Sequence, residues 1–248
     1  MKLVTLSDTH GKHHNAVFPE VPAGDILIHA GDATRKGTLD ELDNFFKWFS
    51  SLPHQYKIFV AGNHDIGLDP EFVDDRRLYI PEEERLEQAR EMSLKAEQLI
   101  PDNVIYLKDS FVEIEDPGMH RKLKIYGSPF TPRFLNWAFL RNRGPAMEDK
   151  WSSIPNDTDI LVTHGPAYGH GDVAPPWILS RYQRSVGCLE LLKKILEVKP
   201  KIHVFGHIHG GRGIYQSDEL PTTSMNSSIC TESYAPTNLP LTFDLDTV

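Results

Sequence analysis

Short apolar runs rich in β-branched residues recur along the chain, and each stops at a glycine or a polar residue. Runs of about four to eight such residues are typical of strands that are buried on both faces. The five strongest runs cover residues 2–7, 25–30, 56–61, 159–163 and 202–205. Weaker runs predict a meander of short strands and then a last strand, at 104–107, 111–114, 123–126 and 241–245.

Helices are predicted where apolar positions recur every three or four residues. The segment 39–52 is apolar at positions 39, 42, 45, 46, 49 and 52, and Thr38 with Glu41 forms a potential capping box. Two further helices are predicted over 81–99 and 186–197. Proline and glycine mark 13–24 as a loop, and 127–144 is predicted to be a long loop rich in aromatic residues.

The order of these elements favours an α/β fold. Strands and a helix alternate first and several short strands follow, which predicts two mixed sheets stacked on each other with helices outside. The 248 residues are enough for one large core, and we expect a single domain over 1–248.

Composition and charge narrow the classes of function. The net charge of −9 argues against binding long nucleic acid, because that affinity comes from clustered Lys and Arg. No apolar stretch is long enough to span a bilayer, and the N-terminal apolar run is too short for a signal peptide, so we expect a cytoplasmic protein without membrane partners. Cys188 and Cys230 lack CxxC spacing and are expected to be reduced core residues.

The candidate chemistry lies where the strands end. After the run at 202–205 the chain continues as Gly206-His207-Ile208-His209, and on an extended backbone the two histidines face the same way. Two such imidazoles could bind one metal ion, or one ion each of a close pair. Alone, the pattern equally fits a surface turn with two exposed histidines.

The other four strong runs end in similar residues. They are followed by Asp8-x-His10, Gly31-Asp32, Gly62-Asn63-His64-Asp65 and His164-Gly165. Because open α/β sheets place their ligand crevice at the carboxyl ends of the strands, we expect these side chains to lie together. Carboxylate and imidazole ligands without cysteine suit Mn, Fe, Zn or Co, and two close cations need a bridging anion such as an aspartate.

These motifs, in this order, resemble those of the calcineurin-like metallophosphoesterases: D-x-H, G-D, G-N-H-[DE], H and G-H-x-H. Within that family the sequence looks closest to the MPPED branch, the class III cyclic-nucleotide phosphodiesterase-like proteins. The passages that suggest this branch are 127–139, 163–172, 186–192 and 226–245. The resemblance implies a four-layer α/β/β/α sandwich with the metal site at the C-terminal strand ends.

Carried over by motif, the resemblance implies two divalent metal ions with Asp32 as the bridge. One ion would be bound by Asp8, His10, Asp32 and His209, and the other by Asp32, Asn63, His164 and His207. As a catalytic residue, His64 would point at the substrate, where it could protonate the leaving group or stabilise phosphoryl charge, and Asp65 could orient it. Mn²⁺ is the expected metal, with Fe, Zn, Co and Mg as alternatives.

The predicted function is hydrolysis of small phosphodiesters, with cyclic nucleotides as the first candidates. A hydroxide that bridges the metals would attack phosphorus in line with the leaving oxygen. Two alternatives remain open: a broader phosphomonoesterase or nuclease on the same site, and a non-catalytic binding scaffold. The expected partner is a small phosphodiester or nucleotide, and the oligomeric state is left open.

Other residues carry weaker expectations. In the aromatic segment, Trp137 first and Phe130 second could stack on a nucleobase, or the segment could form a hydrophobic lid. His29 and His203, inside strands, are expected to be packing groups or groups that support the ligands. Residues expected in solvated loops are His13, His14, His54 and His120. Arg35 and Lys36 could hold a phosphate or lie in a solvated loop. His170 and Asp172 follow the His164 loop and could border the site.

Overall fold

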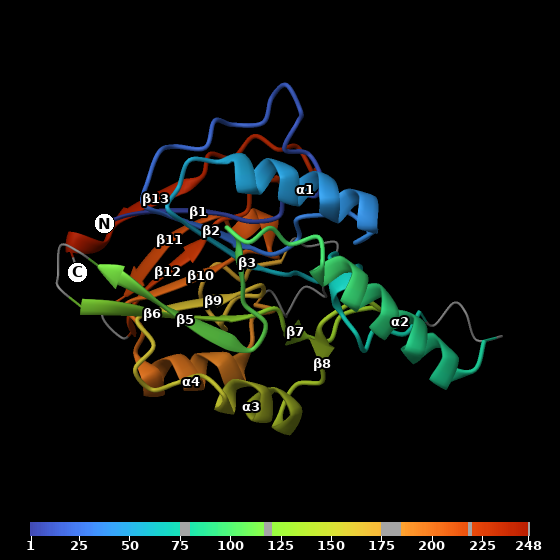
Figure 1. The fold of residues 1–248 in the computed structure, drawn as a ribbon. Coiled ribbons are helices and arrows are strands. Elements are labelled where there is room, and N and C mark those ends of the chain that lie inside the picture. Colours follow the sequence, from blue (N-terminus) through green and yellow to red (C-terminus); the bar gives the residue numbers. More distant parts are fainter. Residues whose placement is uncertain (75–79, 117–120, 175–184, 218–219, 248) are drawn as a thin grey trace.

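Two mixed sheets stack between helices in the computed structural model, which describes residues 1–74, 80–116, 121–174, 185–217 and 220–247 (Figure 1). The first sheet has the strand order β13-β1-β2-β3-β4, and the second has the order β11-β12-β10-β9-β6-β5. Helices α1 and α2 lie on the side of the first sheet, and α3 and α4 lie on the side of the second. The predicted α/β/β/α sandwich is therefore confirmed.

The first sheet is parallel except at one edge. Its parallel strands are β1 (Lys2–Leu6), β2 (Ile26–Ala30), β3 (Tyr56–Val60) and β4 (Ile105–Tyr106), and the antiparallel edge strand is β13 (Leu241–Asp244). Its helices are α1 (Leu39–Ser51) and α2 (Glu82–Glu97). The capping box predicted at the start of α1 is present, since Glu41 N donates to Thr38 and the Glu41 carboxylate accepts from Thr38 N.

The second sheet has a parallel centre and two antiparallel edges. The central strands are β6 (Arg121–Ser128), β9 (Ile160–Thr163), β10 (Ile202–Phe205) and β12 (Leu220–Asn226), and the edges are β5 (Ser110–Asp116) and β11 (Gly213–Ser217). Its helices are α3 (Pro145–Ser152) and α4 (Leu189–Val198). Shorter elements are β7 (Thr131–Pro132), β8 (Leu140–Arg141), η1 (Ile66–Leu68), η3 (His209–Gly211) and η4 (Leu245–Thr247).

Neighbouring residues of each central strand enter two different cores. Between the sheets, Ile28 and Val60 of the first pack in one cluster with Val204 of the second. On the opposite face, Leu27 and Phe59 belong to the cluster that contains the buried side of α1. A strand buried on both faces needs apolar residues at consecutive positions, which is why these strands are visible as continuous apolar runs.

Several elements differ from the prediction. The run at 104–107 does not continue into a meander, because β4 pairs with β3 of the first sheet while β5 and β6 pair in the second. The predicted loop 127–144 contains β7 and β8. Helix α4 begins after Cys188, whose sulfur accepts a hydrogen bond from Leu191 N at the helix start. Strand β12 was not predicted because its buried positions carry Ser and Thr.

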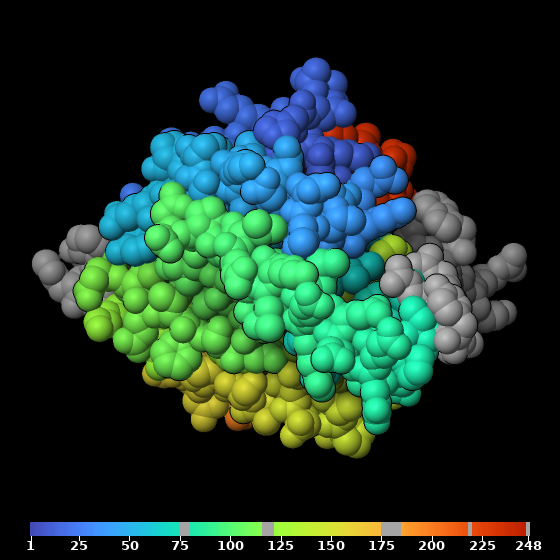
Figure 2. All heavy atoms as spheres, turned by 45° about the vertical axis from the view of Figure 1, so that its right-hand side comes forward, coloured from blue at the N-terminus to red at the C-terminus, as the bar shows by residue number. Residues whose placement is uncertain are grey.

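The exterior reflects the same layering. On the face shown in Figure 2, the N-terminal residues in blue and the yellow residues of the α3 region lie at opposite ends, with the middle of the chain in green between them. None of the helices in the described part of the chain combines the length and the apolarity needed to cross a membrane.

Candidate metal centre

The polar residues that follow five strands meet at one end of the stacked sheets. Asp8, Asp32 and Asn63 follow β1, β2 and β3, and the remaining residues follow β9 and β10. Ligand atoms lie within 4.8 Å of one another in three groups: Asp8, His10 and His209; His10, Asp32 and His64; and Asp32, His164 and His207. All seven predicted metal ligands are therefore brought together, once Asn63 beside His164 is included.

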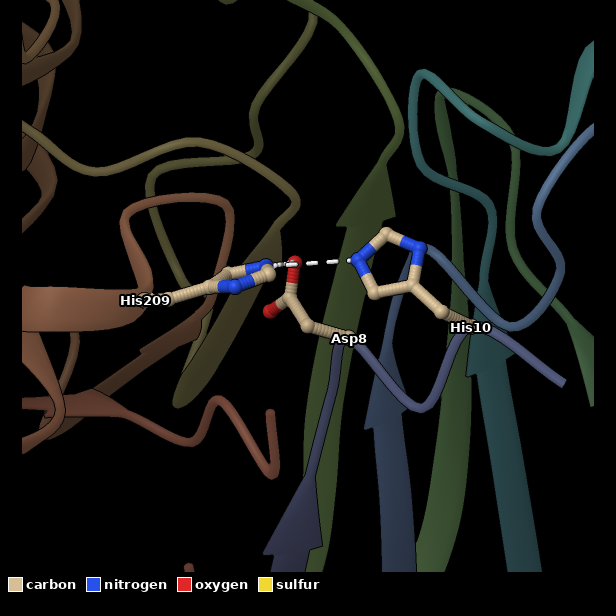
Figure 3. A group of neighbouring side chains, drawn as sticks. All are labelled: Asp8, His10 and His209. Atoms are coloured by element: carbon tan, nitrogen blue, oxygen red, sulfur yellow. Dashed lines mark hydrogen bonds and ion pairs between the residues drawn. The ribbon is translucent and has the colours of Figure 1, made fainter. Parts of the chain in front are cut away.

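The first group is Asp8, His10 and His209, whose side chains point toward one another in Figure 3. Nε2 of His209 lies 3.3 Å from Oδ1 of Asp8 and 3.2 Å from Nε2 of His10. The other carboxylate oxygen of Asp8 accepts hydrogen bonds from Ser7 Oγ at 2.6 Å and Ser228 Oγ at 2.8 Å. Asp8 is thus held by its neighbours with Oδ1 directed at the histidines.

The second group is Asp32, Asn63, His164 and His207. Nε2 of His164 lies 2.9 Å from Oδ1 of Asn63, 3.2 Å from Nδ1 of His207 and 3.4 Å from Oδ1 of Asp32. The other oxygen of Asp32, Oδ2, lies 3.8 Å from Nε2 of His10 in the first group. Asp32 therefore directs one carboxylate oxygen at each group, which is the arrangement that a bridging ligand requires.

Hydrogen bonds outside the groups orient the imidazoles. The Nδ1 atoms of His10, His164 and His209 lie 3.2, 3.0 and 3.0 Å from the backbone carbonyls of Thr34, Ala30 and Thr231. Because a carbonyl only accepts, Nδ1 carries the hydrogen, and in the neutral ring Nε2 presents a lone pair. Nε2 of His10 and Nε2 of His209 are 3.2 Å apart, too close for two lone pairs. Burial opposes charge on His209, but Asp8 outweighs it and raises the pKa of His209, so a proton on His209 can lie between the rings. A divalent cation can take the place of that proton, so the residues fit a metal site.

The pKa values of most of these ligands favour the protonation states that bind a cation. Burial raises the pKa of Asp8 and of Asp32, but their histidine partners outweigh burial and hold both pKa values below the usual range. Burial lowers the pKa of His10 to about 4 and that of His207 to about 3, so both rings are neutral at pH 7. Burial also opposes charge on His164, yet Asp32 outweighs it and raises its pKa to about 9, so a cation must displace that proton.

The backbone around the ligands is strained and closely packed. Asp8, Asp32 and His207 have φ angles of 52°, 55° and 66°, in the left-handed region that non-glycine residues rarely adopt. Glycine is required at two motif positions because a side chain there would collide with a candidate ligand. A Cβ atom on Gly62 would lie 2.3 Å from Oδ1 of Asp32, and one on Gly206 would lie 2.1 Å from Oδ2 of Asp8.

His64 lies beside the ligands, but Asp65 does not orient it as expected. Nδ1 of His64 lies 2.9 Å from the carbonyl of Arg35, to which it donates, and its ring centroid lies 4.1 Å from that of Trp137, with the rings tilted by 31°. Asp65 is buried and accepts hydrogen bonds from the backbone amides of Ala33, Thr34 and Gly62. Its carboxylate therefore joins the loops after β2 and β3.

A cavity of about 440 Å³ opens beside the two groups. Its polar end is formed by Asp32, Asn63, His64, His207 and His209. Its walls include the apolar side chains Phe134, Leu135, Trp137 and Ile208, together with Arg133, Arg143 and Tyr234. Volumes of roughly 300–1,000 Å³ are usual for sites that bind small molecules.

The aromatic segment is divided between the cavity and the core. Trp137 lines the cavity, which is the position that stacking on a nucleobase requires. Phe130 is only 7% exposed and packs against Phe139, with Arg141 and Lys150 at 4.4 and 3.9 Å from its ring centroid. The suggestion that Phe130 stacks on a nucleobase is therefore wrong.

The remaining histidines follow the expectations only in part. His29 and His203 are buried packing groups, hydrogen bonded to the hydroxyls of Thr9 and Thr163 beside candidate ligands. His14 is exposed as expected, and His120 lies outside the described residues. His13 and His54 are buried instead of solvated, because His13 stacks on Trp48 at 4.8 Å and His54 donates to the Pro22 carbonyl.

Four further candidate residues do not line this cavity: Arg35, Lys36, His170 and Asp172. Arg35 and Lys36 are exposed, as expected for a solvated loop. Asp172 is buried and accepts hydrogen bonds from the amides of Gly169 and Gly187. His170 is partly exposed, with Nδ1 lying 3.1 Å from the Tyr168 carbonyl.

Sequence reasoning missed Ser7, Ser228 and Tyr234. Ser7 directly precedes Asp8, so its position was a signal that could have been used. Ser228 and Tyr234 follow β12, the strand whose polar composition concealed it. Their roles depend on the stacking of the two sheets, because Ser228 bridges to Ser7 after β1.

Comparisons with known proteins agree with this geometry. Residues 1–211 match the family described as calcineurin-like phosphoesterase. Metallophosphoesterase domain-containing protein 1 of Homo sapiens is 41% identical over 251 residues, covering 99% of this chain and 71% of that protein. A UPF0046 protein of Caenorhabditis elegans is 35% identical over 254 residues, covering 99% of this chain and 60% of that protein.

Solved structures show the same fold at low sequence identity. TT1561 of Thermus thermophilus is 12% identical with a TM-score of 0.52, covering 91% of this chain and 88% of that one. Phosphopantetheinyl hydrolase of Mycobacterium tuberculosis is 16% identical with a TM-score of 0.52, covering 94% and 90%. With its motifs complete and its candidate ligands assembled, the chain belongs to the calcineurin-like phosphoesterase family of metal-dependent hydrolases.

Proposed function

We propose that the chain is a phosphodiesterase of small phosphodiesters that uses two divalent metal ions. Cyclic nucleotides are the first candidate substrates and Mn²⁺ is the expected metal. One observation carries the proposal: Asp32 directs one oxygen at each of two groups of ligand atoms, at the polar end of a cavity of about 440 Å³. The family supports a phosphoesterase, and the cavity supports a small substrate.

The chain would hold the two ions from both sheets. Asp8, His10 and His209 would complete one site with Asp32, and Asn63, His164 and His207 would complete the other. Two ions so held supply an activated water and neutralise the charge of the transferred phosphoryl group. The tight hydrogen bonding of Asp8 and Asp65 keeps the loops that carry these ligands in fixed positions.

His64 would act on the substrate from beside the ions. Its Nδ1–H is used by the Arg35 carbonyl, so Nε2 is the ring atom left for the substrate. A proton on Nε2 could pass to the leaving oxygen, and contact with Trp137 limits rotation of the ring. In this role His64 acts on the leaving group and binds no metal.

The walls of the cavity support an ester with a flat apolar group. Trp137 and Phe134 lie on the same cavity as the candidate ligands, and rings of this kind stack on nucleobases. The net charge of −9 gives the chain no general attraction for long nucleic acid. A cytoplasmic location is also part of the proposal, and the buried free thiols of Cys188 and Cys230 support it.

Metal removal and substrate choice test the function directly. The protein stripped of metal should hydrolyse nothing, and reloading with Mn²⁺ should restore turnover of bis-p-nitrophenyl phosphate and of a cyclic nucleotide. Reloading with Fe²⁺, Co²⁺, Zn²⁺ or Mg²⁺ ranks the other ions. Faster turnover of p-nitrophenyl phosphate than of the bis-ester would identify a phosphomonoesterase. Inactivity with every ion and every ester would favour a binding scaffold.

Replacing Asp32 tests the bridge. Asp32→Asn should abolish turnover and lower the bound metal more than any other single ligand change, because only this carboxylate is directed at both groups. Metal content would be measured by mass spectrometry of the purified protein. Asp172→Asn alters another buried aspartate away from the cavity and should keep both ions. Two ions per chain with normal turnover in Asp32→Asn would show that the bridge is assigned wrongly.

Replacing His64 tests the acid role. His64→Ala should keep both ions and lose about 10²–10⁴-fold in turnover of a cyclic nucleotide, whose leaving alkoxide needs a proton. The nitrophenyl diester should lose less, because nitrophenolate leaves without one. His14→Ala, an exposed histidine, should match the unmodified protein. Equal losses on both substrates would exclude proton donation and leave charge stabilisation as the role.

Replacing Trp137 tests the nucleobase contact. A base stacked on an aromatic ring contributes about 1–3 kcal/mol, so Trp137→Ala should bind nucleotide roughly 5- to 150-fold more weakly. Turnover of the bis-nitrophenyl ester, which has no base, should change little. Phe130→Ala should instead lower the melting temperature, because Phe130 is buried. Unchanged nucleotide inhibition in Trp137→Ala, together with a lower melting temperature, would assign Trp137 to packing.

A further inference from the structure

Tyr234 lies against the first ligand group, although none of the metal motifs includes it. Its ring centroid is 5.0 Å from that of His10 and 5.0 Å from that of His209, at interplanar angles of 58° and 73°. The side chain is 45% exposed and lines the same cavity as His64. The ring of His10 also contacts His64, at 4.8 Å, so two polar side chains border the cavity beside one candidate ligand.

A tight turn holds Tyr234 in this position. Its amide donates to the carbonyl of Thr231 at 2.8 Å, and that carbonyl also accepts from Nδ1 of His209 at 3.0 Å. Lys12, from the loop after β1, donates to the carbonyl of Tyr234. The backbone that orients His209 therefore also presents Tyr234 to the cavity.

The backbone of Tyr234 is strained. Its φ angle of 60° lies in the left-handed region, which is uncommon for a bulky residue and persists only where the surroundings enforce it. Within the described part of the chain, the hydroxyl has no hydrogen-bonding partner, while the amide and carbonyl of the residue are both used. A strained turn thus holds the ring of Tyr234 against two candidate metal ligands and leaves its hydroxyl able to donate.

We propose that the Tyr234 hydroxyl donates a hydrogen bond to a non-bridging oxygen of the phosphate that the centre binds. This assignment rests on the proposed function. Charge spreads over the equatorial oxygens in phosphoryl transfer, and a donor already held in place stabilises it without reorganisation. The role differs from that of His64, because a bond to a non-bridging oxygen is the same whichever group leaves.

Tyr234→Phe removes the hydroxyl and keeps the ring against His10 and His209. With the Mn²⁺-loaded protein, kcat and kcat/KM should fall about 10²-fold or more, by equal factors for the nitrophenyl diester and the cyclic nucleotide. Metal content and melting temperature should be unchanged. Tyr168→Phe is the matched control, since Tyr168 is 46% exposed and does not line the cavity.

A second measurement does not need turnover. Binding of inorganic phosphate to the Mn²⁺-loaded protein, measured by calorimetry, should be about tenfold or more weaker in Tyr234→Phe than in the unmodified chain. If no ester is hydrolysed but phosphate binding weakens in this way, the proposed function fails and the hydroxyl contact stands. Turnover and phosphate binding that both stay within about twofold of the unmodified chain overturn the proposal. If, in that case, Tyr234→Leu loses metal while Tyr234→Phe keeps it, the ring of Tyr234 only packs against the ligands.

Discussion

Electronegative atoms that face one another at about 3 Å are the constraint on which this structure depends. Nε2 of His10 and Nε2 of His209 are 3.2 Å apart, and both rings use their Nδ1 hydrogens elsewhere. Two such nitrogens need a proton or a metal cation between them. The surrounding structure must therefore hold the ligands in place.

The supporting features are hydrogen bonds, close backbone contacts and strained dihedral angles. Ser7 and Ser228 fix one oxygen of Asp8, and Asp65 joins the loops after β2 and β3 by their amides. Gly62 permits the backbone to approach Asp32 more closely than any side chain would allow. Binding of cations would offset the strain and the repulsion together, so metal affinity and local order are coupled in this site.

The centre is complete only when the two sheets are stacked. Asp8 and Asp32 come from the first sheet, and His209 comes from the second. Backbone hydrogen bonds join the sheets next to the ligands, since Ser7 N donates to Ser227 O and Ile229 N donates to Ser7 O. The packing that forms the core between the sheets is therefore also what brings the two ligand groups to the same carboxylate.

The sequence by itself determined the five strands that the candidate ligands follow, and the candidate ligands themselves. Strands buried on both faces require consecutive apolar residues, and parallel strands bring the residues after them to one edge, so both features are visible in local patterns. Only the tertiary structure decided which sheet β4 joins, why β12 is buried with Ser and Thr, and that Phe130 enters the core while Trp137 lines the cavity. It also placed Tyr234 beside His10. These outcomes depend on contacts between segments far apart in the chain, which no local period or spacing encodes.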